Sequence, residues 1–170
     1  MSPEGLDELK EVLQTIPTAL LKEGDIKPVV IDTGASRISS GFRDDFVPGT
    51  LKKLKDPYRL DGIAGSSSSA THEGVVKYEV LGDNGSIVTV KAKGLFLTDL
   101  GCRLYSPQYH FKELKEQGKS GGSVEIFWDK AKLKLPGNKS ITIPLDNNTF
   151  LPIMKCFKSA EDMASSLALT

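Results

Sequence analysis

From residue 26 onward, the chain is a succession of short runs of β-branched and aromatic residues, separated by glycine, proline and asparagine. Runs of this length between turn residues are typical of β-strands joined by tight turns. Asn84-Gly85 stands between two such runs, and this dipeptide is the strongest short-range signal for a hairpin. We expect strands at 26–31, 58–60, 75–80, 87–90, 124–128, 131–135 and 141–144. The pattern predicts a mainly antiparallel barrel or sandwich-like domain.

Two segments have the pattern of helices instead. Residues 2–4 read Ser-Pro-Glu, a hydroxyl cap followed by proline and an acid, and leucines then recur at helical spacing. We therefore expect an amphipathic helix over 3–15 and a second, short helix around 107–117. The serine run 66–69 is expected to be a loop tip between strands.

The charge balance argues against a nucleic-acid binder. The 22 basic and 22 acidic side chains cancel, whereas such proteins usually carry a basic excess. No apolar run approaches the roughly 20 residues that span a bilayer, and residues 1–10 lack the features of a secretory signal. We therefore expect a cytoplasmic protein that binds neither nucleic acid directly nor a membrane.

Cysteine and histidine are too sparse for a cofactor or metal prediction. Cys102 and Cys156 are far apart and outside any Cys-x-x-Cys pattern, which favours a reducing compartment over a disulfide framework. His72 and His110 have no cysteine or carboxylate neighbours at ligand spacing. We expect no metal and no cofactor.

The residues with the clearest chemical meaning follow the first strand. A six-residue apolar run leads into Asp32-Thr33-Gly34, and the small residues Ala35 and Ser36 come next. A carboxylate at the end of a strand can reach a water in a cleft, threonine can brace the loop, and glycine permits close backbone approach. An ordinary turn after a strand is the alternative interpretation, and the local sequence leaves both open.

A single carboxylate that activates a water is insufficient to hydrolyse a peptide bond. Activating a water while protonating the carbonyl takes two carboxyls that share one proton. The chain has no second Asp-Thr-Gly or Asp-Ser-Gly, and Asp44, Asp45, Asp61 and Asp146 lack the strand context. The second carboxyl must then come from another copy of Asp32, across a two-fold axis.

A glycine-flanked segment lies about thirty residues after Asp32. Gly62-Ile63-Ala64-Gly65 places an apolar side chain between glycines, a composition that suits a flap folding over an extended peptide. A flexible turn with an incidental isoleucine is the alternative.

The order of these segments resembles the retropepsins, specifically the proteases of copia-type retrotransposon polyproteins. The resemblance covers residues 26 to 155 and rests on motifs in the same order. These motifs are Val-Val-Ile-Asp-Thr-Gly-Ala-Ser at 29–36, Gly-Ile-Ala-Gly at 62–65, Glu-Gly-Val-Val-Lys-Tyr-Glu-Val at 73–80, Gly-Leu-Phe-Leu at 94–97, Arg-Leu-Tyr-Ser-Pro-Gln at 103–108, and the Leu-Pro-Gly-Asn, Ile-Pro-Leu-Asp and Leu-Pro-Ile segments near 135–153.

The resemblance implies a closed antiparallel β-barrel-like protomer of an aspartic protease, with an N-terminal helix and one short later helix. Asp32 would be the catalytic acid, and Thr33 would bond across the homodimer. Gly34 would offer its backbone to an extended polypeptide substrate, and Ile63 would lie in the flap. The enzyme would be an endopeptidase that processes the retroelement polyprotein, in the cytoplasm or within retroelement particles.

The resemblance also implies a support loop. Leu104-Tyr105-Ser106 would occupy the place of an apolar-apolar-glycine motif beneath the catalytic loop. Ser106 departs from the pattern because glycine is usual there, although serine fits where the backbone keeps an ordinary conformation. Ser36 departs from it as well, since retroviral enzymes usually carry an acid there that grips the substrate backbone. The cleavage specificity is therefore not carried over.

The expected organisation is a helical extension at 1–25, a protease domain at 26–157 and a flexible tail at 158–170. A non-catalytic dimeric module that binds peptides or assists assembly is a second hypothesis. A third is an unrelated β domain whose Asp-Thr-Gly is coincidental. The oligomeric state and the distance between the two Asp32 carboxyls would separate the three.

Overall fold

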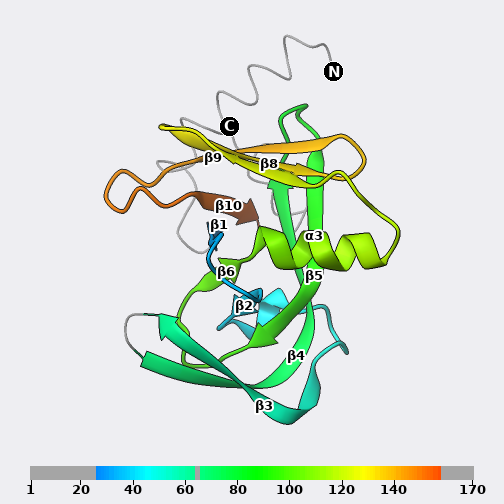
Figure 1. Cartoon of the computed structure of the whole chain (residues 1–170), viewed down its shortest axis with the longest axis vertical. Helices are drawn as coiled ribbons and strands as arrows, with labels where there is room; N and C mark the ends of the chain where they lie inside the picture. Colours follow the sequence, from blue (N-terminus) through cyan, green and yellow to red (C-terminus); the bar gives the residue numbers. More distant parts are fainter. Residues whose placement is uncertain (1–25, 64–65, 158–170) are drawn as a thin grey trace. The chain divides into compact units, whose positions relative to one another are not determined.

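The computed structural model of the chain describes residues 26–63 and 66–157 (Figure 1). The helix expected over 3–15, the tail expected over 158–170, and Ala64 and Gly65 at the expected flap tip lie outside the described residues.

The described chain is mainly β, with one α-helix. Asn84-Gly85 stands in the turn between β4 and β5, so the hairpin predicted there is confirmed. The helix predicted near 107–117 is also confirmed. The elements are β1 Ile26–Ile31, β2 Ser39–Ser40, η2 Arg43–Asp45, β3 Lys52–Ile63, β4 Ser66–Leu81, β5 Ile87–Phe96, β6 Arg103–Tyr105, α3 Pro107–Glu116, β7 Ser123–Ile126, β8 Lys130–Leu135, β9 Lys139–Pro144 and β10 Ile153–Phe157.

Six strands close into a mixed barrel. The strand order is β10-β1-β6-β2-β5-β4-β3, and a further pairing of β10 with β4 closes the ring and leaves β3 at an edge. The predicted antiparallel barrel is wrong in one respect, because β1 pairs with β6, and β2 with β5, in parallel. Parallel neighbours need long connections, so their pairing leaves no turn signal in the local sequence.

The chain divides into two compact units. The first comprises Val29–Lys77 and Val90–Ser120 and is called the Asp32 unit here. The second includes Tyr78–Thr89 and the described residues from Gly121 onward, and is called the Asp83 unit.

The Asp83 unit is built around the antiparallel sheet β7-β8-β9. In β8 and β9, buried residues alternate with less buried ones, as expected for strands with one face in a core. Gly137 and Asn138 both have positive φ in the turn between β8 and β9, the conformation that tight hairpin turns require. The buried side chains of β8 and β9 are Ala131, Leu133, Leu135, Ile141 and Ile143.

Asp83 joins the β4–β5 turn to β9 within the same unit. Its carboxylate accepts hydrogen bonds from Ser140 Oγ at 2.6 Å and from the Thr142 backbone N–H at 2.9 Å. Burial raises the pKa of Asp83, but the hydrogen bonds from Ser140 and Thr142 oppose it and the net pKa is lowered. The turn is thus held by an ionised carboxylate.

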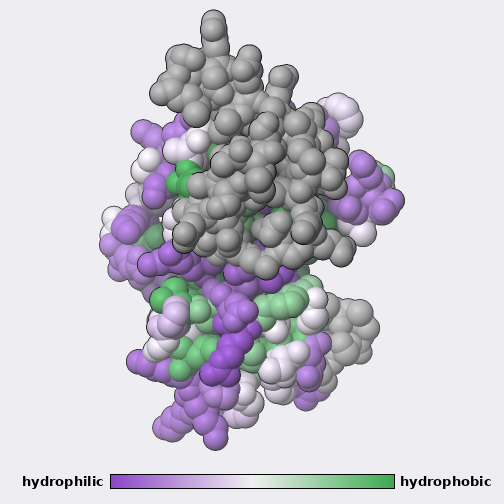
Figure 2. Space-filling view, turned by 180° about the vertical axis from the view of Figure 1, so that it is seen from behind, coloured by the Kyte–Doolittle hydropathy of each residue, from purple (hydrophilic) through white to green (hydrophobic). Residues whose placement is uncertain are grey.

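Hydrophobic side chains also reach the surface, where they form patches among hydrophilic residues (Figure 2). Trp128, between β7 and β8, is 91% exposed, and Phe150, between β9 and β10, is 74% exposed. Both belong to the Asp83 unit, and neither contributes to its core.

The Asp32 unit contains most of a long hairpin made by β3 and β4 (Figure 1). The predicted strand 58–60 is much too short, and the predicted loop at Ser66–Ser69 is wrong, because both segments lie in paired strands. The described side chains of β3 are exposed or only partly buried, so no alternation of apolar and polar residues marks this strand.

A buried ion pair fixes the segment after β2 in the Asp32 unit. Asp45, in η2, is 1% exposed and accepts hydrogen bonds from Ser40 Oγ at 2.6 Å and from Arg103 Nε at 2.7 Å. The guanidinium carbon of Arg103 also lies 3.9 Å from the centroid of the Phe42 ring. β2, η2 and β6 are therefore joined through one carboxylate.

We predict that Asp45→Asn destabilises the protein by about 3–5 kcal/mol, because Arg103 keeps a largely buried charge without its partner. Asp44→Asn, at the exposed neighbouring position, is the matched control and should change stability by less than about 0.5 kcal/mol. Urea unfolding of the two variants measures both effects. Equal midpoints for the two variants would contradict the role given to Asp45.

Candidate functional site

Asp32 stands directly after the buried end of β1. Ile31 is 2% exposed, whereas Asp32 is only half-buried. The Asp32 backbone N–H donates to the Tyr105 carbonyl at 2.9 Å, which extends the pairing of β1 with β6 by one residue. The end of the buried strand β1 therefore places the Asp32 carboxylate at the surface of the Asp32 unit.

The Asp-Thr-Gly segment is a turn closed by its own aspartate. Asp32 Oδ1 accepts a hydrogen bond from the Gly34 N–H at 2.9 Å, and the Asp32 carbonyl accepts one from the Ala35 N–H at 3.2 Å. A Cβ added at Gly34 would lie 3.4 Å from Asp32 Oδ1. The protomer alone has room for a methyl group there, but that group would touch the carboxylate.

The loop after Asp32 crosses the end of β6. In the sheet, β6 lies between β1 and β2, which are the two strands that this loop connects. Because β1 and β6 run in parallel, both end at the same edge of the sheet. The residues that follow β6 consequently lie against the Asp32 loop.

Two side chains at the start of α3 hold this loop by its carbonyl groups. Ser106 Oγ donates to the Ala35 carbonyl at 2.7 Å, and Gln108 Nε2 donates to the Thr33 carbonyl at 2.6 Å. The two bonds lie on either side of Gly34, and we call the pair the carbonyl clip. It fixes the backbone around Gly34, whereas the Thr33 and Ser36 side chains stay exposed.

Ser106 has two roles at this point. Its backbone is extended, with φ −99° and ψ 107°, a conformation that any L-residue adopts. Its hydroxyl oxygen also accepts a hydrogen bond from the Tyr109 N–H at 3.3 Å, which caps α3. Serine at this position thus links the helix start to the loop, which glycine could not do.

The other expected support residues are part of the core. Leu104 and Tyr105 are buried on β6, and Leu104 pairs with both Val30 on β1 and Ser39 on β2. The structure therefore brings the expected loop residues 32–36 together with the expected support residues 104–106.

The expected flap residues Gly62 and Ile63 end β3, where Ile63 pairs with Ser66. The described contacts between the hairpin and the Asp32 loop lie nearer the base of the hairpin; in one of them Ser36 Oγ is 3.5 Å from the Tyr58 hydroxyl. The flap interpretation thus stays a prediction.

Sequence reasoning missed Arg37, Gln108 and His110. For Ser106 the sequence did hold a signal, because Ser106-Pro107 has the cap-then-proline pattern of a helix start. No pattern in the sequence indicates the bond of Gln108 to a carbonyl 75 residues away.

His110 and Tyr105 form a buried polar pair beneath the loop. The Tyr105 hydroxyl lies 2.5 Å from His110 Nδ1, and His110 is 3% exposed. Burial lowers the pKa of His110 to about 4, although a hydrogen bond with the Lys91 backbone raises it. Burial, and to a lesser extent the Glu113 carboxylate, raise the pKa of Tyr105 above its usual range. Both groups are therefore neutral at neutral pH.

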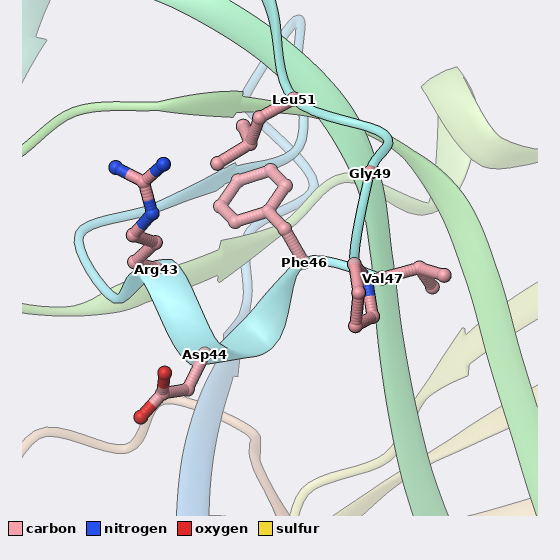
Figure 3. Close-up of a pocket in the computed structure, with 7 residues that line it drawn as sticks. Arg43, Asp44, Phe46, Val47, Gly49 and Leu51 are labelled. Carbon is pink, nitrogen blue, oxygen red and sulfur yellow. The ribbon is translucent and has the colours of Figure 1, made fainter.

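A separate cavity of about 380 Å³ is lined by η2 and the segment that follows it (Figure 3). The Phe46 ring and the Leu51 side chain point toward each other in it, whereas the Asp44 carboxylate points away. Gly74 backs this pair, since a Cβ there would lie within 3.0 Å of both side chains. The cavity is lined by Arg43, Asp44, Phe46, Val47, Pro48, Gly49 and Leu51, and it shares no residue with the Asp32 loop.

Within residues 26–63 and 66–157, no three histidine, cysteine or acidic side chains gather as metal ligands. In the same residues, no helix is long and apolar enough to cross a membrane. No family model and no curated protein matches the chain.

We predict that Ser106→Ala destabilises the protein by about 1–3 kcal/mol, because the partly buried Ala35 carbonyl and the Tyr109 N–H each lose a partner. Chemical denaturation measures the change. Ser36→Ala, in the same loop but exposed, is the control and should stay within about 0.5 kcal/mol of the wild type. A loss in the control as large as that of Ser106→Ala would contradict the carbonyl clip.

We predict that stability falls as the pH is lowered from about 6.5 to about 4. The unfolded chain binds a proton at His110 below the ordinary histidine pKa of 6.5, whereas the folded chain resists protonation until about 4. This difference of about 2.5 pH units corresponds to a loss of about 3 kcal/mol. Unfolding measured across this range tests it.

His110→Asn should flatten the pH dependence between about 6.5 and 4, because asparagine does not titrate there. His72→Gln is the control, because it removes the other histidine and keeps His110. The same slope in the His110 variant and the wild type would show that other groups carry the acid sensitivity.

Proposed function

We propose that the chain is an aspartic endopeptidase that acts as a homodimer, with one Asp32 carboxyl from each copy. The observation that carries the proposal is the presentation of Asp32 at the end of a core strand, on a turn held by β6 and α3. A rigid backbone around a half-buried carboxylate suits a catalytic group, since catalysis requires positions fixed to within a fraction of an ångström.

The hydrogen bonding of the carboxylate is consistent with this role. Asp32 Oδ1 is occupied by the Gly34 N–H. Within the described residues, Oδ2 has no hydrogen-bond donor. One oxygen is therefore used to orient the group, and the other can contact a water or a second carboxyl.

The need for a second copy follows from the chemistry. In the proposed reaction, the ionised carboxyl of the pair takes a proton from a water, whose oxygen attacks the peptide carbonyl carbon. The protonated carboxyl gives its proton to the carbonyl oxygen, so that a neutral diol forms. When the C–N bond breaks, the protonated carboxyl gives its proton to the leaving nitrogen and the other carboxyl takes a proton from a diol hydroxyl, so that the pair again holds one proton.

The exposed positions of the loop suit such a dimer. The Thr33 side chain is exposed while its carbonyl is held by Gln108, so its hydroxyl is available to the second copy. Gly34 is also exposed, and the protomer itself has room for a Cβ there. A close approach that only glycine permits would then involve a substrate or the second copy.

The β3–β4 hairpin supports the choice of substrate. It is a long antiparallel arm with an edge strand, and such an arm can pair with an extended peptide through backbone hydrogen bonds. We propose that its tip closes over the peptide and excludes water. The resemblance at 29–36 and 103–108 suggests that this peptide belongs to a retroelement polyprotein.

We predict that Asp32→Asn lowers kcat for a polyprotein-junction peptide by at least about a thousandfold, while the dimer persists in sedimentation. A pepstatin-like inhibitor should block the wild type. A variant that retained full activity would contradict the proposal. A dimer that binds the peptide but never cleaves it would favour the non-catalytic module.

Mixing the wild type with the Asp32→Asn variant gives a sharper test of the homodimer. If each site needs both carboxyls and subunits exchange freely, activity falls as the square of the wild-type fraction. A linear decrease would mean that each chain works alone.

A further inference from the structure

Arg37, the residue after Ser36, joins the Asp32 loop to three other elements, β3, α3 and β4. Its guanidinium carbon lies 5.2 Å from the centroid of the Tyr58 ring on β3 and 4.7 Å from that of the Tyr109 ring on α3. The same guanidinium forms an ion pair with the Glu73 carboxylate on β4. The Arg37 side chain is 15% exposed, so these contacts are shielded from bulk water.

The contacts suit arginine in particular. Its planar guanidinium can lie over aromatic faces while its N–H groups point to a carboxylate, which a lysine ammonium cannot do in the same way. Burial raises the pKa of Tyr109, and the positive charge of Arg37 opposes that rise. The two rings and the ion pair together connect the Arg37 side chain to three elements.

These contacts lie at an irregularity in the β3–β4 hairpin. Lys53 pairs with His72, but the next pair is Tyr58 with Ala70. Residues 54–57 of β3 therefore oppose the single residue Thr71 of β4, and such an excess bends the strand that carries it. Tyr58 lies just beyond this bend, and Glu73 lies just before it.

We propose that Arg37 is a positioning residue that fixes the bend of the β3–β4 hairpin against the Asp32 loop and α3. The proposal rests on the function proposed above, in which the outer part of the hairpin covers a bound peptide. By holding Tyr58 and Glu73 on opposite sides of the bend, Arg37 sets the direction in which the outer hairpin leaves the base.

Loss of Arg37 should affect peptide binding but not the position of the Asp32 carboxyl. The Asp32 backbone is held separately by Tyr105, Ser106 and Gln108, none of which needs Arg37. Losing Arg37 should therefore loosen the hairpin and weaken peptide binding, while the carboxyl stays in place. Weaker peptide binding with an unchanged chemical step would distinguish Arg37 from a catalytic residue.

The test uses the full chain with Arg37→Gln and, separately, Glu73→Gln, which keeps the size of the side chain and leaves Arg37 in place. We expect amide hydrogen exchange in 52–59 and 69–73 to accelerate at least about fivefold in both variants. KM for a junction peptide should rise about tenfold, with kcat changed by less than about threefold. Arg43→Gln, at an exposed arginine of the same unit, is the matched control and should change neither quantity.

Unchanged hairpin exchange in both variants would overturn the proposal, whether or not the wild type cleaves peptides. A fall in kcat at constant KM would overturn it as well, because Arg37 would then act on the chemical step. A wild-type chain that cleaves no peptide would contradict the proposed function alone, and hydrogen exchange would still decide the role of Arg37.

Discussion

The parallel pairing of β1 with β6 is the constraint on which the arrangement around Asp32 depends. It ends both strands at one edge and continues into the bond between the Asp32 N–H and the Tyr105 carbonyl, 2.9 Å long. Since β6 also pairs with β2, the connecting loop has to pass over its end. The start of α3 is thereby brought to the two carbonyls that it holds.

Local sequence predicted the elements whose residues face a core. β1 and the Asn84-Gly85 hairpin follow from apolar runs and a turn dipeptide, and α3 follows from the spacing of its apolar residues. The full lengths of β3 and β4 were missed, because exposed lysines and a serine run carry no burial pattern. The parallel pairs were missed because they depend on contacts between distant segments.

In the candidate site, too, some residues could be predicted from the sequence and others could not. Asp32 was found from its motif, and the support residues 104–106 from a resemblance in order and composition. Gln108 and Arg37 were not found, since their partners lie up to 75 residues away and are reached only through the fold. Ser106 stands where glycine is usual in the resembled pattern, and the reason for serine is visible only in the structure. A hydroxyl there bonds to both the loop and the helix, so the loop is fixed by a side chain rather than by close backbone packing.

The composition of β3 has a consequence for the protein in concentrated solution. A free edge strand exposes unpaired backbone groups that can recruit another chain into an aggregate. Here the first half of the edge carries the exposed Lys52, Lys53 and Lys55, and the exposed Pro57 has no N–H to offer. Like-charge repulsion and the bend at 54–57 therefore discourage stacking of one molecule's edge on another's. The arm proposed to receive a peptide is thus protected from uncontrolled association along its base.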